Sequence, residues 1–287
     1  MIDKLAIIGV GLIGSSLSLA LKQAGAVGQV IGFGRNRQNL ARGVELGVLD
    51  DFADSIEASV RDADVIVVAV PLGAMRQVFT ELKPAIRKDA IITDVGSAKG
   101  SVVAAARDEL GALFPRFVPG HPIAGTEKSG VEAGFASLYQ KRRVIITPLP
   151  QTDHDAISVI DEMWRHCGAI VECLSVEHHD KVLAATSHLP HMLAYALVHQ
   201  LSNLNDHEEI FRYASGGFRD FTRIASSDPV MWRDVCISNG DALVSLIEQY
   251  QQELDRVKAA INAEDADELL KLFGRAKSER DSLIGNC

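Results

Sequence analysis

The sequence predicts an α/β domain with a doubly wound parallel sheet, followed by an all-helical domain. Two observations support this fold class. Short apolar runs alternate with helical patterns up to about residue 173, and only helical patterns follow from Ser175 to the end. Strands that alternate with helices are typical of a parallel sheet covered by helices on both faces. We therefore expect a first domain over residues 1–170 and a helical second domain over residues 171–287.

The sheet is expected to begin at Leu5–Ile8, an apolar run that is directly followed by the glycine motif G-x-G-x-x-G and a helical segment. In a dinucleotide site the first glycine permits a tight turn, the second lets the backbone approach a pyrophosphate, and the third lets helix pack on strand. The helix N-terminus attracts the phosphates. The strand–motif–helix context argues against a glycine turn without ligand and against a signal-peptide core. The motif therefore predicts a Rossmann-type NAD(P) site made by Gly9, Gly11, Leu12, Ile13 and Gly14.

The later elements of the first domain follow from continuous apolar runs and from helical spacing. The expected strands cover residues 27–33, 64–70, 90–94, 117–120, 143–147 and 169–173, the last of which closes the sheet. Helices are expected over residues 73–86 and 153–166. These elements complete a parallel sheet with helices on both faces.

The second domain contains two clear helix starts. Ser175 can cap a helix that has Glu177 in its first turn. Asp228 and Pro229 begin another, a capping acid followed by proline at the first helical position. The apolar residues of this second helix recur at intervals of three and four up to Ile261, a stripe that usually packs against other helices.

Composition and charge exclude several classes of partner. The formal net charge of -9 argues against nucleic acid or an anionic membrane, so an anionic substrate needs a local basic pocket. No apolar run reaches membrane-spanning length without glycine or polar breaks. The four cysteines show neither a CxxC pair nor metal-ligand spacing, which favours reduced, structural thiols. A cytoplasmic location is expected because the three glycines of the motif argue against a signal peptide.

The end of the second strand bears on the choice of cofactor. An acidic residue at this place would bond a ribose hydroxyl of NAD, but the sequence has Gly34-Arg35-Asn36-Arg37 there. Arg35 can bind the 2′-phosphate of NADP. The alternative is that Arg35 and Arg37 belong to a solvated turn, and the sequence does not decide between the two.

Two stretches lie where ligands bind in an open α/β sheet, beyond the carboxyl ends of the strands. The first contains Ser97 in GSAKG, and the second contains His121 in GHPIAGTE. A histidine poised near neutral pH is the usual acceptor for the proton of a carbinol whose hydride leaves. A surface-turn histidine is the alternative for His121.

The helical domain contributes two further stretches with polar side chains. His188 and His191 lie three apart in SHLPH, and without a third ligand they make a poor metal site, so hydrogen bonds to a polar substrate are favoured and no metal is expected. Arg219 and Arg223 lie four apart, and guanidinium groups suit carboxylates. Exposed salt bridges are the commoner explanation of any single arginine.

These stretches together resemble one family. The motifs GxGxxG, GSxKG, HPIAGTE, SHLPH and GFRDFTRIASSDPVMWRD are similar to those of prephenate and arogenate dehydrogenases of tyrosine biosynthesis, from Lys4 to about Lys277. The resemblance is to the bacterial type without a fused mutase or regulatory domain. It implies oxidative decarboxylation of prephenate to 4-hydroxyphenylpyruvate with hydride transfer to NAD(P). Arogenate, or both substrates, is the alternative.

The resemblance also implies roles for individual residues. His121 matches the catalytic histidine, and Ser97 its hydrogen-bonding helper. His188 and His191 match histidines of the substrate pocket, and Arg223 matches the residue that binds a substrate carboxylate.

Three more residues are implied at the edge of that pocket. Glu127 and Asp220 resemble acids that pair with the arginine of FTRIA, and Trp232 resembles a residue lent to the neighbouring subunit's site. The implied assembly is a homodimer formed by the helical domains, to which the apolar stripe up to Ile261 is suited. Tyrosine feedback, if present, is expected to act at or near the active site.

Two rival functions come from other classes. One is another Rossmann dehydrogenase with a helical domain, such as a hydroxyacid dehydrogenase or an imine reductase, and HPIAGTE and SHLPH speak against it. The other is a non-catalytic NAD(P) sensor, which would not need Ser97, His121 and Arg223 together. The preferences for prephenate or arogenate, and for NAD or NADP, stay open.

Overall fold

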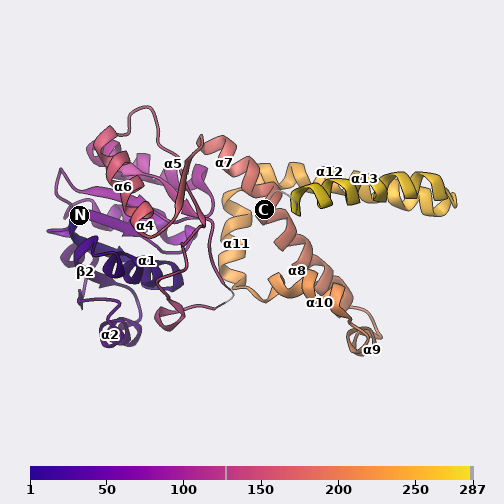
Figure 1. Cartoon of the computed structure of the whole chain (residues 1–287), viewed down its shortest axis with the longest axis horizontal. Coiled ribbons are helices and arrows are strands. Elements are labelled where there is room, and N and C mark those ends of the chain that lie inside the picture. The colour runs from indigo at the N-terminus through magenta and orange to yellow at the C-terminus, as the bar shows by residue number, and fades with distance from the viewer. Residues whose placement is uncertain (127, 285–287) are drawn as a thin grey trace. The chain divides into compact units, whose positions relative to one another are not determined.

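The computed structural model describes residues 1–126 and 128–284. The chain divides into two compact units, Met1–Gly240 and Asp241–Cys287, each of which is described by itself (Figure 1). The first unit contains the α/β region and helices α7 to α11. The predicted fold class, a doubly wound parallel sheet followed by helices, is confirmed.

A six-stranded parallel sheet forms the centre of the first unit. The strand order is β3-β2-β1-β4-β5-β6, the order typical of Rossmann-type domains. The bounds are β1 Ile2–Ile8, β2 Val27–Phe33, β3 Asp51–Phe52, β4 Val65–Val68, β5 Ile91–Asp94 and β6 Phe117–Val118. The carboxyl ends of β1, β4 and β5 therefore lie side by side, where a ligand is expected.

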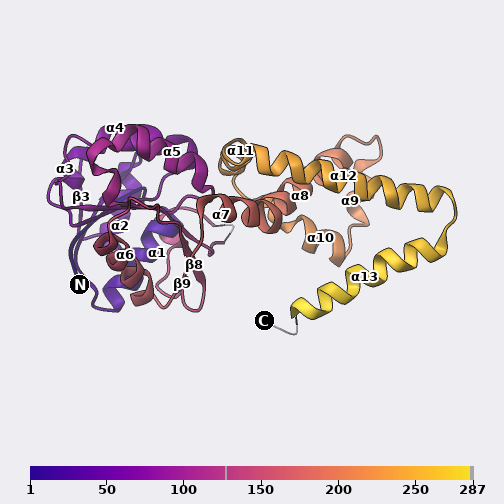
Figure 2. The same cartoon turned by 90° about the horizontal axis from the view of Figure 1, so that it is seen from above.

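Helices cover both faces of this sheet (Figure 2). Side chains alternate along β1, so that Leu5 and Ile7 join one apolar core and Ala6 and Ile8 join the other. This arrangement explains why the strands read as continuous apolar runs. The first core includes α1 Leu12–Gln23, α2 Arg37–Glu45 and α6 His154–His166, and the second includes α3 Ile56–Val60, α4 Met75–Leu82 and α5 Lys99–Leu110.

The prediction that residues 169–173 close the main sheet is wrong. The strands β7 Gly120–Pro122, β8 Arg143–Ile146 and β9 Ile170–Cys173 form a separate sheet, in which β7 pairs antiparallel to β8. The expected strand over residues 117–120 divides at Pro119, because proline has no N–H to donate to a ladder. His121 consequently lies on a strand of the second sheet that continues from an edge strand of the first.

Short helices complete the first unit. Their bounds are α7 Val176–Leu183, a π-helical turn η4 Ala184–His188, α8 Leu189–Ser202, α9 His207–Arg212, α10 Gly216–Thr222, η5 Arg223–Ser226 and α11 Pro229–Ser238. Both predicted helix starts are confirmed. The Ser175 hydroxyl accepts a hydrogen bond from the N–H of His178 at 3.1 Å, and the Asp228 carboxylate accepts one from the N–H of Val230 at 2.8 Å.

The helix expected to run from Pro229 to Ile261 is in fact two helices. α11 ends before Asn239, whose φ of -118° and ψ of 35° are not helical, and α12 Gly240–Asn262 follows. The Asn239 side chain contacts the Asp180 carbonyl oxygen and Nδ1 of His188, and these contacts hold the backbone in the break.

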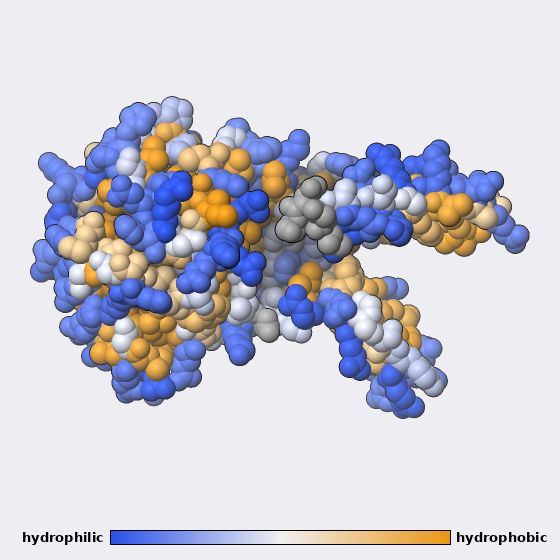
Figure 3. Space-filling model, in the orientation of Figure 1, coloured by the Kyte–Doolittle hydropathy of each residue, from blue (hydrophilic) through white to orange (hydrophobic). Residues whose placement is uncertain are grey.

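From Asp241 on, the second unit consists of α12 and α13 Ala266–Ile284, joined by a turn in which Glu264 has a φ of 52°. Arg256 of α12 pairs with Glu268 of α13. Much of the predicted apolar stripe is exposed, with Leu254 at 52% and Ile261 at 58%. Figure 3 shows apolar residues gathered on the surface of α12 and α13. No helix of the described residues is long and apolar enough to cross a membrane.

Candidate active site

The glycine motif has the geometry that a dinucleotide site requires. Gly9 has a φ of 99°, which permits the tight turn after β1. A Cβ on Gly14 would lie 2.6 Å from the Gly9 carbonyl oxygen, so only glycine lets α1 pack this closely. A Cβ on Gly11 would meet open space, and α1 begins beside it without a side-chain cap. The free N–H groups of that helix are thus available to phosphates.

The end of β2 leaves one arginine available for a ligand. Arg37 pairs with Asp54 and lies over the Phe52 ring at 5.3 Å, and Asn36 caps α2 through the N–H of Asn39 at 3.0 Å. Within residues 1–126 and 128–284, the exposed Arg35 side chain has no hydrogen-bond or ion-pair partner. Arg35 is therefore the side chain of this turn that suits a cofactor phosphate.

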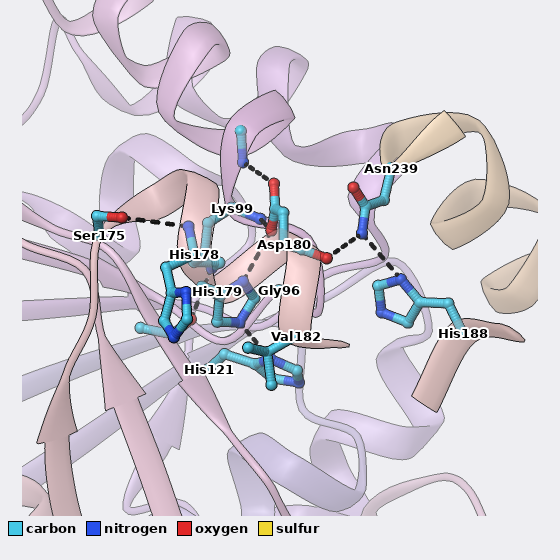
Figure 4. A network of polar contacts seen from close by, with 12 residues as sticks. Gly96, Lys99, His121, Ser175, His178, His179, Asp180, Val182, His188 and Asn239 are labelled. Carbon is cyan, nitrogen blue, oxygen red and sulfur yellow. Dashed lines mark hydrogen bonds and ion pairs between the residues drawn. The ribbon is translucent and has the colours of Figure 1, made fainter. Parts of the chain in front are cut away.

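His121 belongs to a chain of hydrogen-bonded side chains (Figure 4). Its Nδ1 lies 2.9 Å from Nε2 of His179, and Nδ1 of His179 lies 2.7 Å from Oδ1 of Asp180. The Asp180 carboxylate also accepts hydrogen bonds from the N–H groups of Lys99 and Gly100, each at 2.7 Å. These two amides lie in the first turn of α5, so the Asp180 carboxylate, at the end of the row of hydrogen-bonded side chains, binds a helix N-terminus.

The chain of contacts fixes which ring nitrogens carry protons. A carboxylate can only accept, so Nδ1 of His179 is the protonated nitrogen, and in the neutral ring its Nε2 is an acceptor. Nδ1 of His121 must then donate to His179. This leaves Nε2 of His121 with a lone pair, ready to take a proton from a bound molecule.

A buried ion pair positions the strand that carries His121. Lys99 and Asp94 are completely buried and paired with each other. The Lys99 ammonium also donates to the Gly120 carbonyl at 2.6 Å, and the Asp94 carboxylate accepts from the Gly120 N–H at 3.2 Å. Both backbone groups of the residue before His121 are thus held at the end of β5.

The site keeps its histidines neutral. The pKa of His121 lies well below its ordinary value, first because the ring is desolvated and then because His179 and Lys99 oppose a further positive charge. Desolvation lowers the pKa of His188 to about 4 against the opposing effect of Asp180. The pKa of His191 is also lowered, mainly by desolvation. At neutral pH all three rings are therefore available as neutral donors and acceptors.

His188 and His191 lie against Trp232 of α11. The Trp232 ring stacks on His191 with centroids 3.7 Å apart and meets His188 edge-on at 6.2 Å. Nδ1 of His191 donates to the Ser187 carbonyl at 2.8 Å. Trp232 is 8% exposed in its own chain. Its predicted contribution to a neighbouring subunit's site stays a prediction.

Fewer contacts locate the remaining predicted site residues, which are Ser97, Arg223, Asp220 and Glu127. The Ser97 backbone raises the pKa of His188 and the charge of Arg223 lowers that of His191, which puts both residues near the histidines. Asp220 is exposed, and its predicted pairing with Arg223 stays a prediction. Glu127 lies outside the described residues.

Sequence reasoning missed several residues of this site. His179 and Asp180 were not predicted, because their contact with His121 joins positions 58 residues apart and no local spacing reveals it. Asn239 and the structural role of Lys99 were missed for the same reason. No group of three or more metal-ligating side chains that could hold an ion occurs in the described residues.

Two family models match the chain. One, described as "Prephenate dehydrogenase, nucleotide-binding domain", matches residues 17–173, and the other, "Prephenate dehydrogenase, dimerization domain", matches residues 175–275. Together they cover most of the sequence.

Individual proteins agree with the family models. The cyclohexadienyl dehydrogenase of Zymomonas mobilis is 40% identical over 97% of this chain and 95% of its own length, and the prephenate dehydrogenase of Bacillus subtilis is 37% identical over 99% and 76%. The crystal structure of Aquifex aeolicus prephenate dehydrogenase with hydroxyphenyl propionate and NAD+ matches with a TM-score of 0.92 at 37% identity, over 99% of both chains. Synechocystis arogenate dehydrogenase matches with a TM-score of 0.82 at 27% identity, over 98% of this chain and 99% of its own. The chain therefore belongs to the prephenate dehydrogenase family of NAD-dependent oxidoreductases.

Proposed function

We propose that the chain converts prephenate to 4-hydroxyphenylpyruvate and CO2 by hydride transfer to NAD(P), with His121 as the general base. The observation that carries the proposal is the chain of contacts from Asp180 through His179 to His121, which leaves Nε2 of His121 as a proton acceptor. The related Aquifex structure holds NAD+ together with a hydroxyphenyl compound, which supports the same ligand classes here.

The residues present fit a nicotinamide dinucleotide. Gly11 leaves open space beside the uncapped start of α1, and residues 9–14 would hold the pyrophosphate. When bound, the cofactor supplies the hydride acceptor. Ser97 would hydrogen-bond at the reacting end, since it follows β5, whose carboxyl end opens on the same edge as that of β1.

His121 would accept the proton of the substrate hydroxyl and later return it. Its Nε2 accepts that proton as the hydride leaves the carbinol carbon, and Asp180 offsets the positive charge that reaches His121 and His179. Loss of CO2 leaves its bonding electrons in the ring, which becomes aromatic. His121 then returns the proton to the phenolate oxygen, so that atoms and charge balance.

Arg223 is proposed to hold a substrate carboxylate, because its charge lies near His191 and guanidinium groups bind carboxylates in a bidentate way. His188 and His191 would hydrogen-bond the polar groups of the substrate. The roles of Asp220, Glu127 and Trp232 stay predictions.

Arogenate is the second candidate substrate. It has an amino group where prephenate has a keto oxygen. The similarity to a cyclohexadienyl dehydrogenase and to an arogenate dehydrogenase favours testing it. Initial rates of NAD(P)H formation with prephenate and with arogenate, each with NAD and NADP, test both proposals. Turnover of neither substrate by the folded enzyme would overturn them.

Arg35 is proposed to bind the 2′-phosphate of NADP, because it is exposed and has no partner among the described residues, whereas its neighbour Arg37 is paired with Asp54. Arg35→Ala should lower kcat/KM for NADP relative to NAD by about 10- to 150-fold, the loss of one hydrogen-bonded charge. Arg37→Ala is the matched control. An unchanged ratio in Arg35→Ala would exclude this role.

We also propose a homodimer and a domain boundary near residue 170. The match to a dimerization domain and the exposed apolar side chains of α12 and α13, such as Leu254 and Phe273, support the dimer. A monomer at micromolar concentration with full activity would contradict it. The two family models meet between residues 173 and 175, close to the proposed boundary. The cytoplasmic location and the lack of nucleic-acid partners stay predictions.

A further inference from the structure

Asn39, in the first turn of α2, connects the glycine turn with the segment that follows β7. Its Nδ2 lies 2.8 Å from the Val10 carbonyl oxygen, and its Oδ1 lies 3.1 Å from the backbone nitrogen of Val131, the first residue of η3 Val131–Ala133. A carbonyl oxygen can only accept and a backbone N–H can only donate. The two contacts therefore fix the orientation of the Asn39 amide.

The Val10 carbonyl depends on this amide. Within residues 1–126 and 128–284, its oxygen has no hydrogen-bond partner other than Nδ2 of Asn39. The Gly11 N–H belongs to the same peptide group, and in a trans peptide the N–H points in the opposite direction to the C=O. By holding the Val10 carbonyl, Asn39 also sets the direction of the Gly11 N–H, which points away from the amide.

The Gly11 N–H is one of several free donors in this turn. In the described part of the chain, the backbone N–H groups of residues 11–14 have no hydrogen-bond partner. The carbonyls beside them are bound by side chains, because the Gly11 oxygen accepts from the Ser15 hydroxyl at 2.6 Å. Likewise, the Ile13 oxygen accepts from the Tyr139 hydroxyl at 2.6 Å. Free N–H groups beside carbonyls that face other partners suit an anion such as a pyrophosphate.

The second contact of Asn39 keeps the amide in place. The segment that ends at Val131 begins at β7, which carries His121, and η3 is held beside α1 and α2 by further contacts. Glu132 pairs with Arg42 of α2 at 2.8 Å, and the Phe135 N–H donates to the Ser16 hydroxyl of α1 at 3.1 Å. An amide that is bound at both ends cannot turn away from Val10.

We infer that Asn39 is a positioning residue for the cofactor, because it holds the Val10 carbonyl so that the Gly11 N–H faces the pyrophosphate. The inference rests on the proposed NAD(P) site at residues 9–14 and not on the identity of the substrate. NAD and NADP share the pyrophosphate and differ in the 2′-phosphate. Asn39 should therefore contribute equally to the binding of both, whereas Arg35 should change their ratio.

Titration calorimetry of the enzyme without prephenate tests the inference through Kd for NAD+ and for NADP+. In Asn39→Asp the acceptor for the Val131 N–H remains, but an oxygen replaces the NH2 group that faces the Val10 carbonyl. Both Kd values should rise by about 5- to 150-fold, as expected for a hydrogen-bonding group left without its partner, and their ratio should be unchanged. The matched control is Gln38→Glu, which adds the same charge at the adjacent, exposed position and should leave Kd for NAD+ unchanged.

The pH dependence of Kd separates positioning from a structural defect. A protonated carboxyl regains a donor for the Val10 carbonyl. The ratio of Kd in Asn39→Asp to Kd in the wild type should therefore fall as the pH is lowered towards the pKa of an aspartic acid, about 4. A lasting defect in folding would not be reversed by acid, so a ratio that does not fall overturns the inference.

The other outcomes also decide the question. A Kd for NAD+ within about twofold of the wild type in folded Asn39→Asp overturns the inference. If Asn39→Asp fails to fold, Asn39→Ala takes its place, since alanine favours the helix, and the loss of one neutral hydrogen bond should raise both Kd values by about 2- to 12-fold. Unchanged values there overturn the inference as well. A wild-type enzyme that binds NAD+ but does not oxidise prephenate removes the proposed reaction and leaves this inference intact, whereas one that binds neither cofactor overturns both.

Discussion

Removal of the His179 ring tests the hydrogen-bonded series Asp180–His179–His121, called the proton chain below, at its middle residue. His179 is completely buried, and its Nε2 accepts the hydrogen bond from Nδ1 of His121 at 2.9 Å. In His179→Phe a ring of similar shape remains, but His121 loses the acceptor that holds its proton on Nδ1. The proton is then free to move to Nε2, which removes the lone pair needed for catalysis.

The magnitude follows from the cost of the unsatisfied donor. A buried hydrogen-bonding group left without its partner loses about 1–3 kcal/mol. This cost disfavours the competent tautomer of His121 by about 5- to 150-fold, and kcat for prephenate should fall by the same factor. The loss is smaller than that from removal of a general base, which contributes about 100- to 10,000-fold.

Steady-state kinetics with saturating cofactor would measure this effect. The matched control is His178→Phe, since His178 is adjacent and exposed and only its backbone N–H is used, in the cap of α7. Affinity for NAD(P) should be unchanged in both variants, because residues 9–14 lie at the turn between β1 and α1 and not on α7. A kcat for folded His179→Phe within twofold of the wild type would refute the proton chain.

Three further predictions concern binding and stability. In Arg223→Lys the charge stays but the bidentate contact is lost, so KM for prephenate should rise by about 10- to 150-fold with cofactor affinity unchanged; an unchanged KM would move the role to Arg219. The pKa of His188 falls to about 4 on folding, so the unfolded chain binds more protons than the folded chain between pH 6.5 and 4. The free energy of unfolding should therefore decrease as the pH falls through that window, by about 3 kcal/mol for this group. Urea titrations of the wild type and of His188→Gln at several pH values measure the effect, and an equal dependence of the free energy of unfolding on pH in both proteins would contradict it. Lys99→Met leaves the buried Asp94 carboxylate without its counter-ion and should cost about 3–5 kcal/mol of stability; a loss below about 1 kcal/mol in the same titrations would be inconsistent with the pair.

The parts of the fold that depend on local chemistry could be predicted from the sequence. The glycine motif lies at a strand–helix turn because Gly9 adopts a φ of 99° and Gly14 has no room for a Cβ beside the Gly9 carbonyl, demands that are set within a few residues of the motif. The caps at Ser175 and Asp228 depend on residues two or three positions away, and both are present.

The parts that depend on distant partners could not be predicted. Strand β8 pairs with β7, and β9 pairs with β8, in a sheet separated from the first at Pro119, and an apolar run alone does not identify its partner strand. The helix break at Asn239 is stabilised by contacts with α7 and His188, which the apolar stripe on either side conceals. Likewise, the resemblance indicated His121, but its partner His179 became visible only in the folded chain.

The central claim is that Nε2 of His121 accepts the substrate proton, and one variant tests it most directly. His121→Asn retains some hydrogen bonding but lacks the base, so kcat for prephenate should fall by about 100- to 10,000-fold while the affinity for NAD(P) stays unchanged. Wild-type activity should fall on the acid side of the pH profile as the imidazole becomes protonated, and this limb should be absent from the residual activity of the variant. A near-normal kcat in His121→Asn, with the acid limb retained, would contradict the account.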